Sequence, residues 1–177
     1  TMWMAGGGGK TLSIAAQVFD GVYVFAHDAN PRRMADLPAR AQRAGAKIDI
    51  IENAAKSAPY DLILTDVPCS GSGSWRRDPQ GKWALTPAKL AETMAAQAAI
   101  LDASAALLAK GGQLAYATCS VLTRENEAQV AAFLARHPEF TQTSSHRFGL
   151  SVPPDTTAMP PASGDGFFLA ILSRAKA

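Results

Sequence analysis

Two cysteines follow two apolar segments of the chain, and both could take part in covalent chemistry. Cys69 comes three residues after Asp66, just past the apolar segment at residues 60–65. Cys119 directly follows a second apolar segment at residues 113–118. A cysteine at the end of a strand is often only a small buried hydrophobic residue, but a thiolate can also act as a nucleophile. Because the pair lies beside a carboxylate, and another segment could bind a cofactor, the sequence favours chemistry over packing.

Four consecutive glycines near the start of the chain, in AGGGGKT (residues 5–11), indicate a turn between a strand and a helix. A nucleotide-triphosphate loop would need glycine where Met4 stands, and the dinucleotide pattern fails at Thr11. Such a turn still exposes backbone N–H groups that can hold a polar cofactor. The next predicted strand leads into Asp28, where an acidic residue typically meets a ribose hydroxyl. The pattern suits an adenosine-type cofactor such as S-adenosylmethionine, and the alternative is a flexible start and a surface carboxylate.

Apolar segments alternate with helical patterns along the chain, which predicts an α/β fold with a mostly parallel sheet. Strands are expected at residues 22–27, 47–51, 60–65, 113–118 and 167–172. Helices are expected from Pro31 towards Gly45 with a kink or restart at Pro38, from Pro87 to Gly111-Gly112, and from Thr123 to just before Pro138. Long loops are expected at residues 68–83 and 149–166.

The carboxyl ends of parallel strands lie along one edge of a sheet, and ligands bind there. Each candidate residue named above follows a predicted strand or lies in the glycine-rich turn. We therefore expect residues 6–9, Asp28, Asp66, Cys69 and Cys119 to converge at that edge.

Composition and charge exclude several classes of protein. A length of 177 residues with 47% hydrophobic and 18% charged residues is typical of one globular domain. No apolar run approaches the roughly 20 residues of a membrane helix. Neither the two cysteines nor the three histidines have zinc-ligand spacing, so we expect no metal site. We also expect a cytoplasmic location and no membrane partner, while the net charge of +2 leaves nucleic acid open as a partner.

The chain resembles the RNA 5-methylcytosine methyltransferases of the Nol/Nop/Sun family, and most of all their bacterial Sun/Fmu branch, which methylates small-subunit ribosomal RNA. The resemblance rests on paired Pro-Cys and Thr-Cys motifs and runs over nearly the whole chain, in the segments AGGGGKT, DVPCSG, WRRDP, ATCSVL and DGFFLAIL. It implies a Rossmann-like methyltransferase fold that uses S-adenosylmethionine, with helices on both faces of the sheet. It also implies a single catalytic domain over residues 1–177, truncated at its N-terminus and without a separate RNA-binding domain.

The same resemblance implies S-adenosylmethionine-dependent methylation of cytosine C5 in RNA, in EC class 2.1.1, as a step of ribosomal RNA processing. Cys119 would be the nucleophile that adds to C6 of cytosine, and Cys69 would assist release of the product. Asp66 would contact the target cytosine or the cofactor, and Lys10 would help to orient the adduct. The candidate cofactor-binding residues are Met4, Ala5, Gly6, Gly7, Gly8, Gly9, Lys10, Asp28, Arg33, Asn53 and Asp66.

A base can reach such a pocket only when it is unstacked, so the expected substrate is a single-stranded or flipped cytosine. The candidate RNA-binding residues are Trp75, Arg76, Arg77 and Lys82. In the alternative, the tryptophans pack the loop against the domain and the arginines are solvated. Residues 124–127 are interpreted as the start of a helix rather than as a site, and residues 165–168 as a pocket rim.

Three positions depart from the family pattern. Met2 and Met4 stand where the family has Asp and Cys, and Asn53 stands where an Asp commonly faces the adenine. These departures predict weak cofactor binding. Alternative functions are therefore a catalytically impaired or RNA-binding-only fragment, a P-loop nucleotidase disfavoured by Met4, and a small-molecule or protein methyltransferase, which would leave the cysteine pair unexplained.

Overall fold

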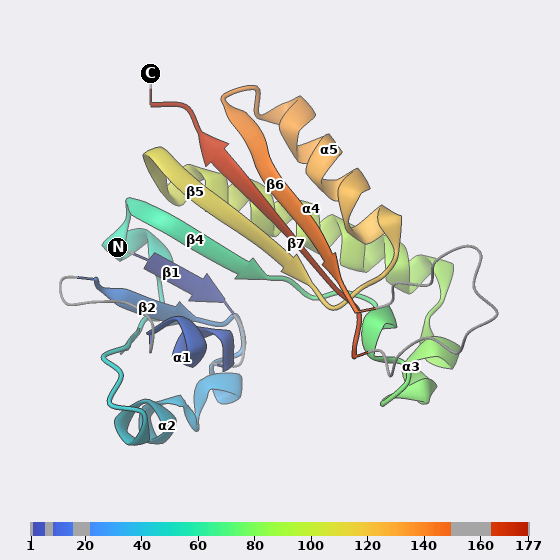
Figure 1. Cartoon of the computed structure of the whole chain (residues 1–177), viewed down its shortest axis with the longest axis horizontal. Helices are drawn as coiled ribbons and strands as arrows, with labels where there is room; N and C mark the ends of the chain where they lie inside the picture. The colour runs from blue at the N-terminus through green and yellow to red at the C-terminus, as the bar shows by residue number, and fades with distance from the viewer. Residues whose placement is uncertain (1, 6–8, 16–21, 150–163, 177) are drawn as a thin grey trace.

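In the computed structural model, the described residues are 2–5, 9–15, 22–149 and 164–176, with only the backbone described at 2–5. They form a seven-stranded sheet in the order β3-β2-β1-β4-β5-β7-β6 (Figure 1). The strands are β1 (Met2–Ala5), β2 (Val24–His27), β3 (Asp49–Ile50), β4 (Tyr60–Asp66), β5 (Leu108–Thr118), β6 (Phe140–Phe148) and β7 (Phe167–Arg174). Neighbouring strands are parallel except at β7, which runs antiparallel to both β5 and β6. The predicted mostly parallel sheet is confirmed.

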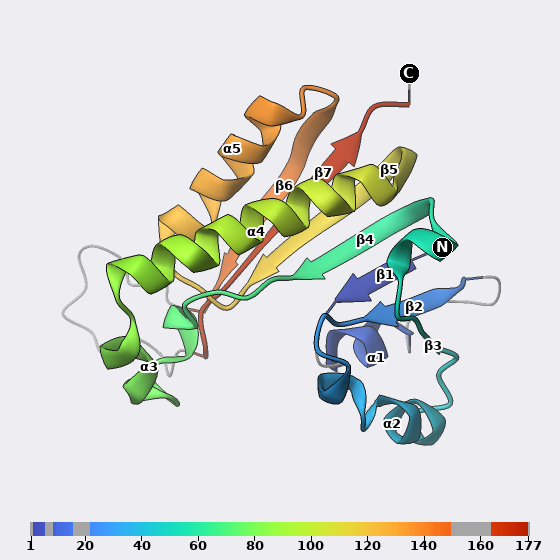
Figure 2. The same ribbon diagram turned by 180° about the vertical axis from the view of Figure 1, so that it is seen from behind.

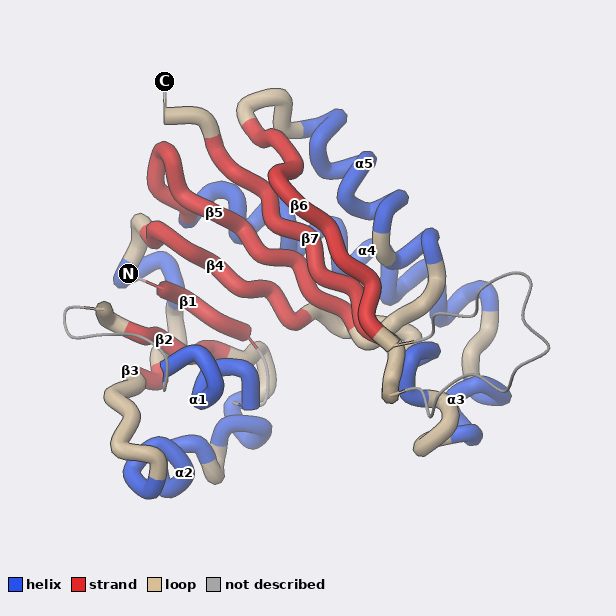
Figure 3. The backbone as a smooth tube through the Cα atoms, viewed as in Figure 1, coloured by secondary structure: helices blue, strands red, loops and turns tan. Residues whose placement is uncertain are grey.

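Helices lie on both faces of this sheet, as predicted. They are α1 (Gly9–Ala15), α2 (Leu37–Arg43), α3 (Pro79–Ala84), α4 (Pro87–Leu107) and α5 (Glu127–Arg136), with 3-10 turns η1 (Pro31–Met34), η2 (Ala54–Ser57), η3 (Ser72–Ser74) and η4 (Thr123–Glu125). Seen from behind, α4 passes in front of β5, β6 and β7, and α5 lies beside it (Figure 2). The backbone trace shows α1 and α2 beside β1 to β3, and α3 beyond the ends of the longer strands (Figure 3). None of the helices in the described part of the chain combines the length and the apolar character needed to cross a membrane.

The main hydrophobic core lies between the sheet and the pair α4 and α5. Its largest fully buried side chains include Tyr60, Leu101, Tyr116, Phe133 and Phe168. Tyr116 and Phe168 meet edge to face, with ring centroids 6.3 Å apart. A smaller apolar cluster lies on the α1 side of the sheet. This packing fixes β4 and β5, whose carboxyl ends carry the cysteine motifs.

Local capping residues set the start of α4 as predicted, but the predicted end of this helix is wrong. The Thr86 hydroxyl accepts a hydrogen bond from Lys89 N at 3.1 Å and caps α4, as the Thr-Pro pattern predicts. The helix does not run on to Gly111-Gly112, because the backbone becomes extended at Leu108 and enters β5 directly. The two glycines instead lie inside β5, next to a register shift against β4, and Gly111 has φ +75°.

The other differences from prediction concern short or exposed elements. The segment from Pro31 breaks into η1 and then α2, with Pro38 in the first turn of α2, so the predicted restart is confirmed. Strand β6 was not predicted because, apart from Phe140, its side chains are exposed or half-buried at the sheet edge. The loop predicted at residues 68–83 contains η3 and most of α3, which Asp78 caps. Residues 150–163 of the second predicted loop lie outside the described residues.

Candidate active site

The carboxyl ends of β4 and β5 bring four candidate residues together. β4 ends at Asp66, and β5 ends one residue before Cys119, at the same edge of the sheet (Figure 1). The Sγ atoms of Cys69 and Cys119 lie 3.2 Å apart. Lys10, in the first turn of α1, places its Nζ atom 2.7 Å from Asp66 Oδ2. A thiol pair and a lysine–carboxylate pair therefore meet at this edge.

Backbone contacts hold the two cysteine loops against each other. Val67 N donates to the Ala117 carbonyl at 3.2 Å, and Gly73 N donates to the Cys119 carbonyl at 2.9 Å. Gly166 N donates to the Gly73 carbonyl at 2.8 Å, which joins the entry of β7 to the same place. A Cβ atom on Gly73 would lie 2.0 Å from the Gly166 carbonyl oxygen, so only glycine fits here.

The two thiols differ in how readily they ionise. The hydrogen bond from Cys69 lowers the pKa of Cys119 to about 7, although burial and the Asp66 carboxylate act in the opposite direction; Lys10 lowers that pKa further. The same hydrogen bond, burial and the negative charge on Cys119 raise the pKa of Cys69 well above its ordinary value. Near neutral pH, Cys119 therefore carries a large fraction of thiolate while Cys69 keeps its proton. The thiolate is the nucleophilic form of cysteine.

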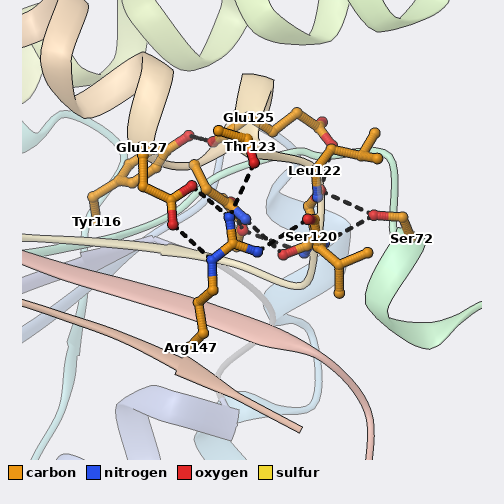
Figure 4. A network of polar contacts seen from close by, with 11 residues as sticks. Ser72, Tyr116, Ser120, Leu122, Thr123, Glu125, Glu127 and Arg147 are labelled. Carbon is orange, nitrogen blue, oxygen red and sulfur yellow. Dashed lines mark hydrogen bonds and ion pairs between the residues drawn. The ribbon is translucent and has the colours of Figure 1, made fainter. Parts of the chain in front are cut away.

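A buried carboxylate lies beneath both cysteine loops. Glu125 is fully buried, and its side chain accepts hydrogen bonds from Ser70, Ser120 and Gln97. Figure 4 shows Glu125 and Ser120 within this network, with the Tyr116 hydroxyl donating to the Glu125 carbonyl at 2.6 Å. Residues 124–127 do lie where the helical segment begins, in η4 and the first turn of α5, and Glu125 in addition contacts both cysteine loops.

Neighbouring residues hold the Thr-Cys loop in place. Asn126 Oδ1 accepts from the Thr118 hydroxyl at 2.7 Å, and its Nδ2 donates to the Ser120 carbonyl at 2.9 Å. Arg147 of β6 forms two hydrogen bonds with the Glu127 carboxylate, at 2.6 and 2.5 Å (Figure 4). Arg147 also donates from Nη1 to the Val121 carbonyl at 3.1 Å, so both Asn126 and the edge strand β6 hold the loop.

A cavity of about 840 Å³ opens beside this edge and extends along the sheet face on the α1 side. Its polar end is formed by Lys10, Asp66 and Thr118, and its apolar walls include Leu64, Phe167 and Ile171. Of the predicted pocket rim at residues 165–168, Phe167 and Phe168 line this cavity.

The candidate cofactor residues lie at the ends of β1, β2 and β3. Asp28 follows β2 and is nearly buried; its Oδ1 accepts from Asn30 N at 2.8 Å, and its Oδ2 lies 3.9 Å from the exposed Arg33. Asn53 follows β3, and its Oδ1 accepts from Ala55 N at 2.9 Å. Met4 and Ala5 belong to β1, but their side chains, and all of Gly6, Gly7 and Gly8, lie outside the described residues. Within the described ranges, no group of three or more His, Cys, Asp or Glu side chains could hold a metal ion.

The candidate RNA-binding residues lie around η3 and α3. Arg77 forms a very short ion pair with Asp165, and Arg76 lies 4.0 Å from the same carboxylate. The arginines are therefore not simply solvated, although both remain largely exposed. Trp75 is half-buried with its indole Nε1 enclosed, which fits the packing alternative for this ring. Lys82 lies over the ring of Trp83, which is 81% exposed.

The sheet order, the single antiparallel strand and the site at the carboxyl ends of β4 and β5 define a Rossmann-like methyltransferase fold. The structure of NSun6 from Pyrococcus horikoshii with SFG shares it, with a TM-score of 0.80 and 23% identity over 100% of this chain and 48% of that one. The chain belongs to the 16S rRNA methyltransferase RsmB/F family, whose sequence model matches residues 3–173. The resemblance drawn from the sequence is confirmed.

Curated relatives give the same family. Ribosomal RNA small subunit methyltransferase B of Sodalis glossinidius is 37% identical over 171 residues, which cover 92% of this chain. The protein of the same name from Klebsiella pneumoniae strain 342 is 36% identical over 173 residues, or 93% of this chain. The match covers only 39% of the length of each of these relatives.

Proposed function

We propose that this chain is the catalytic domain of an RNA cytosine-C5 methyltransferase that acts on small-subunit ribosomal RNA through a covalent cysteine adduct. The observation that carries the proposal is the cysteine pair, in which Cys69 donates a hydrogen bond that lowers the pKa of Cys119 to about 7. Membership of the RsmB/F family and the names of the relatives support ribosomal RNA as the substrate.

The residues present fit S-adenosylmethionine. Asp28 lies nearly buried at the end of β2, where it suits a ribose hydroxyl, and the Asn53 side chain can meet the adenine. The cavity reaches Gly9 at the start of α1. SFG, the molecule in the NSun6 structure, is an analogue of this cofactor, which supports the same choice. When bound, S-adenosylmethionine supplies an electrophilic methyl group.

Cytosine C5 is a poor nucleophile until a group adds at C6. The Cys119 thiolate would form a bond to C6 as the C5–C6 double bond opens, which places electron density on C5. C5 could then take the methyl group while the bond from that group to the cofactor sulfur breaks, and S-adenosylhomocysteine would leave. Asp66 and Lys10 lie beside the thiolate, where they can hold the base edge and orient the adduct. After a base removes the C5 proton, the S–C6 bond breaks and Cys119 leaves as a thiolate, and the Cys69 proton stabilises that leaving sulfur.

The test uses RNA that contains 5-fluorocytidine, in which C5 carries fluorine and the adduct cannot resolve. With S-adenosylmethionine, the protein should form an adduct that resists denaturation, and Cys119→Ala should abolish it. With unmodified RNA, Cys69→Ala should accumulate the covalent complex. An adduct that survives in Cys119→Ala would show that the cysteine roles are misassigned.

The second candidate is a fragment that binds RNA but is catalytically impaired, and the methionines at positions 2 and 4 favour it. This candidate expects RNA binding in a filter assay but neither an adduct nor calorimetric heat from S-adenosylmethionine. A cytoplasmic location and a single domain over residues 1–177 stay predictions.

A further inference from the structure

Glu125 occupies an unusual position for a carboxylate. Its side chain is fully buried, below the site rather than in the cavity. Oε1 accepts from Ser70 N at 2.8 Å and Gln97 Nε2 at 3.1 Å. Oε2 accepts from the Ser70 hydroxyl at 2.5 Å and the Ser120 hydroxyl at 2.6 Å. These four hydrogen bonds match the four lone-pair sites of an ionised carboxylate.

The donors come from both cysteine motifs. Ser70 directly follows Cys69, and Ser120 directly follows Cys119. The loops that carry them belong to segments 50 residues apart in the chain, yet they meet on a single oxygen of Glu125. The carboxylate thereby connects the two backbones one residue beyond each sulfur atom.

Helix α4 completes the connection. Gln97 is fully buried, and its Nε2 donates both to Glu125 and, at 2.9 Å, to the carbonyl of Pro68. Pro68 precedes Cys69 and Ser70 follows it, so the Pro-Cys loop is held on both sides of its cysteine. Glu125 therefore belongs to a framework anchored in the core, not to a surface cap.

We propose that Glu125 is a positioning residue that holds the Cys69 and Cys119 sulfur atoms within hydrogen-bond distance of each other. The inference rests on the proposed function for its purpose, since the thiol pair is what the reaction uses. Without the carboxylate, Ser70 and Ser120 lose their shared acceptor. Ser72 still links the loops, because its hydroxyl lies 3.0 Å from the Ser120 hydroxyl and accepts from Val121 N at 3.0 Å, but Glu125 is the charged acceptor that the residues next to both cysteines share.

Other charged groups around the thiolate stay unchanged when Glu125 is altered. The groups that face Cys119, or pair with one that does, are Cys69, Asp66 at the end of β4, Lys10 of α1, Arg77 beside α3, and Asp165 before β7. Loss of the Glu125 negative charge would by itself lower the pKa of Cys119, so a rise of the Cys119 inflection in Glu125→Gln can be traced to the sulfur–sulfur geometry.

The test measures alkylation of Cys119 by iodoacetamide against pH, with peptide mass spectrometry to separate the two cysteines. In Glu125→Gln, an uncharged amide with one acceptor oxygen replaces the carboxylate that the serine hydroxyls donate to. The midpoint of the alkylation profile of Cys119 should then rise by about one pH unit, so that the alkylation rate at pH 6 falls about tenfold. Cys69→Ala removes the hydrogen-bond donor itself and should move the midpoint in the same direction. Its shift is the largest that a Glu125 variant should reach.

The matched control is Gln129→Leu. Gln129, in α5, is also a buried polar residue, and its Nε2 donates to the Met94 carbonyl at 3.0 Å, away from the cysteine loops. It should lose stability while keeping the wild-type alkylation profile. If Glu125→Gln fails to fold, the double variant Ser70→Ala with Ser120→Ala removes the two hydroxyl donors instead and should raise the inflection.

A folded Glu125→Gln or double serine variant with the wild-type profile would overturn the positioning role. A shift of equal size in Gln129→Leu would overturn it as well, since the effect would then follow from destabilisation. The assay needs neither RNA nor S-adenosylmethionine, so absence of methyl transfer would refute the proposed function and leave this result standing.

Discussion

Cys69 donates a hydrogen bond to the thiolate of Cys119 across 3.2 Å, although the residues are 50 positions apart in sequence. Each cysteine thereby sets the protonation of the other. The sulfur that loses its proton first is the one in the Thr-Cys motif, and the sulfur that keeps it is the one in the Pro-Cys motif. The fold thus gives the two sulfur atoms different protonation near neutral pH, as the proposed roles of nucleophile and hydrogen-bond donor require.

Formation of the 5-fluorocytidine adduct should depend on pH through Cys119. Because its pKa is lowered to about 7, the thiolate fraction rises with pH, and the single-turnover rate should rise through pH 7 and level off above it. At pH 6 the rate should be about tenfold below the plateau. In Cys69→Ala the inflection should move up towards the ordinary thiol value of about 8.5. A profile centred near pH 7 in that variant would mean that another group lowers the pKa.

Lys10→Met should reduce adduct formation with little effect on stability. The Lys10–Asp66 pair is partly exposed, and such pairs contribute about 0–1 kcal/mol to the free energy of unfolding. Removing the positive charge raises the pKa of Cys119 and frees Asp66 from its partner. Lys89→Met, which breaks the exposed pair with Glu92, is the control and should keep full activity. Equal rates of adduct formation in Lys10→Met and Lys89→Met would show that Lys10 has no role in the site.

Gly73→Ala should destabilise the chain and abolish adduct formation. The added methyl group would lie 2.0 Å from the Gly166 carbonyl oxygen and 2.9 Å from the Cys119 carbonyl oxygen, so backbone must move. Overpacking of this kind costs roughly 1–3 kcal/mol, measurable by denaturant unfolding. Gly81→Ala in α3 meets the Asp78 carboxylate first, at 3.3 Å, and should be nearly neutral. Wild-type stability in Gly73→Ala would contradict the close approach.

Hydrogen peroxide should inactivate the protein reversibly. The Cys119 thiolate is oxidised to a sulfenic acid, and the Cys69 sulfur then displaces water from it to form a disulfide. Intact mass and loss of both free thiols report the product, and dithiothreitol should restore both thiols and activity. In Cys69→Ala the oxidation should proceed to forms that dithiothreitol does not reverse. Full activity after peroxide treatment would contradict the short distance between the sulfurs.

The parts of the fold that follow from local patterns were predictable. Apolar runs located five strands, and the Thr86 and Pro87 pair located the start of α4. The edge strand β6 was missed because exposed side chains carry little period-2 signal, and the end of α4 was misplaced because glycine serves a bulge as well as a cap.

The residues of the candidate site likewise fall into those that the sequence identified and those that it did not. Paired motifs identified both cysteines, because motif residues are contiguous in sequence. Glu125 was not identified, since its importance comes from contacts with Ser70 and Gln97, both distant in the chain. An acidic residue at the start of a helix is common and gives no sign of burial. Only the tertiary structure shows which residues surround it.

Strand β7 lies between β5 and β6, although it is synthesised after both. While the ribosome is still making this strand, β5 has an unpaired edge, and β6 has no strand beside it to pair with. The contacts from Gly166 to Gly73 and from Asp165 to Arg77 form only when β7 inserts. The thiol site is therefore completed only after β7 has been synthesised, and termination before β7 would leave the site incomplete and the edge of β5 exposed.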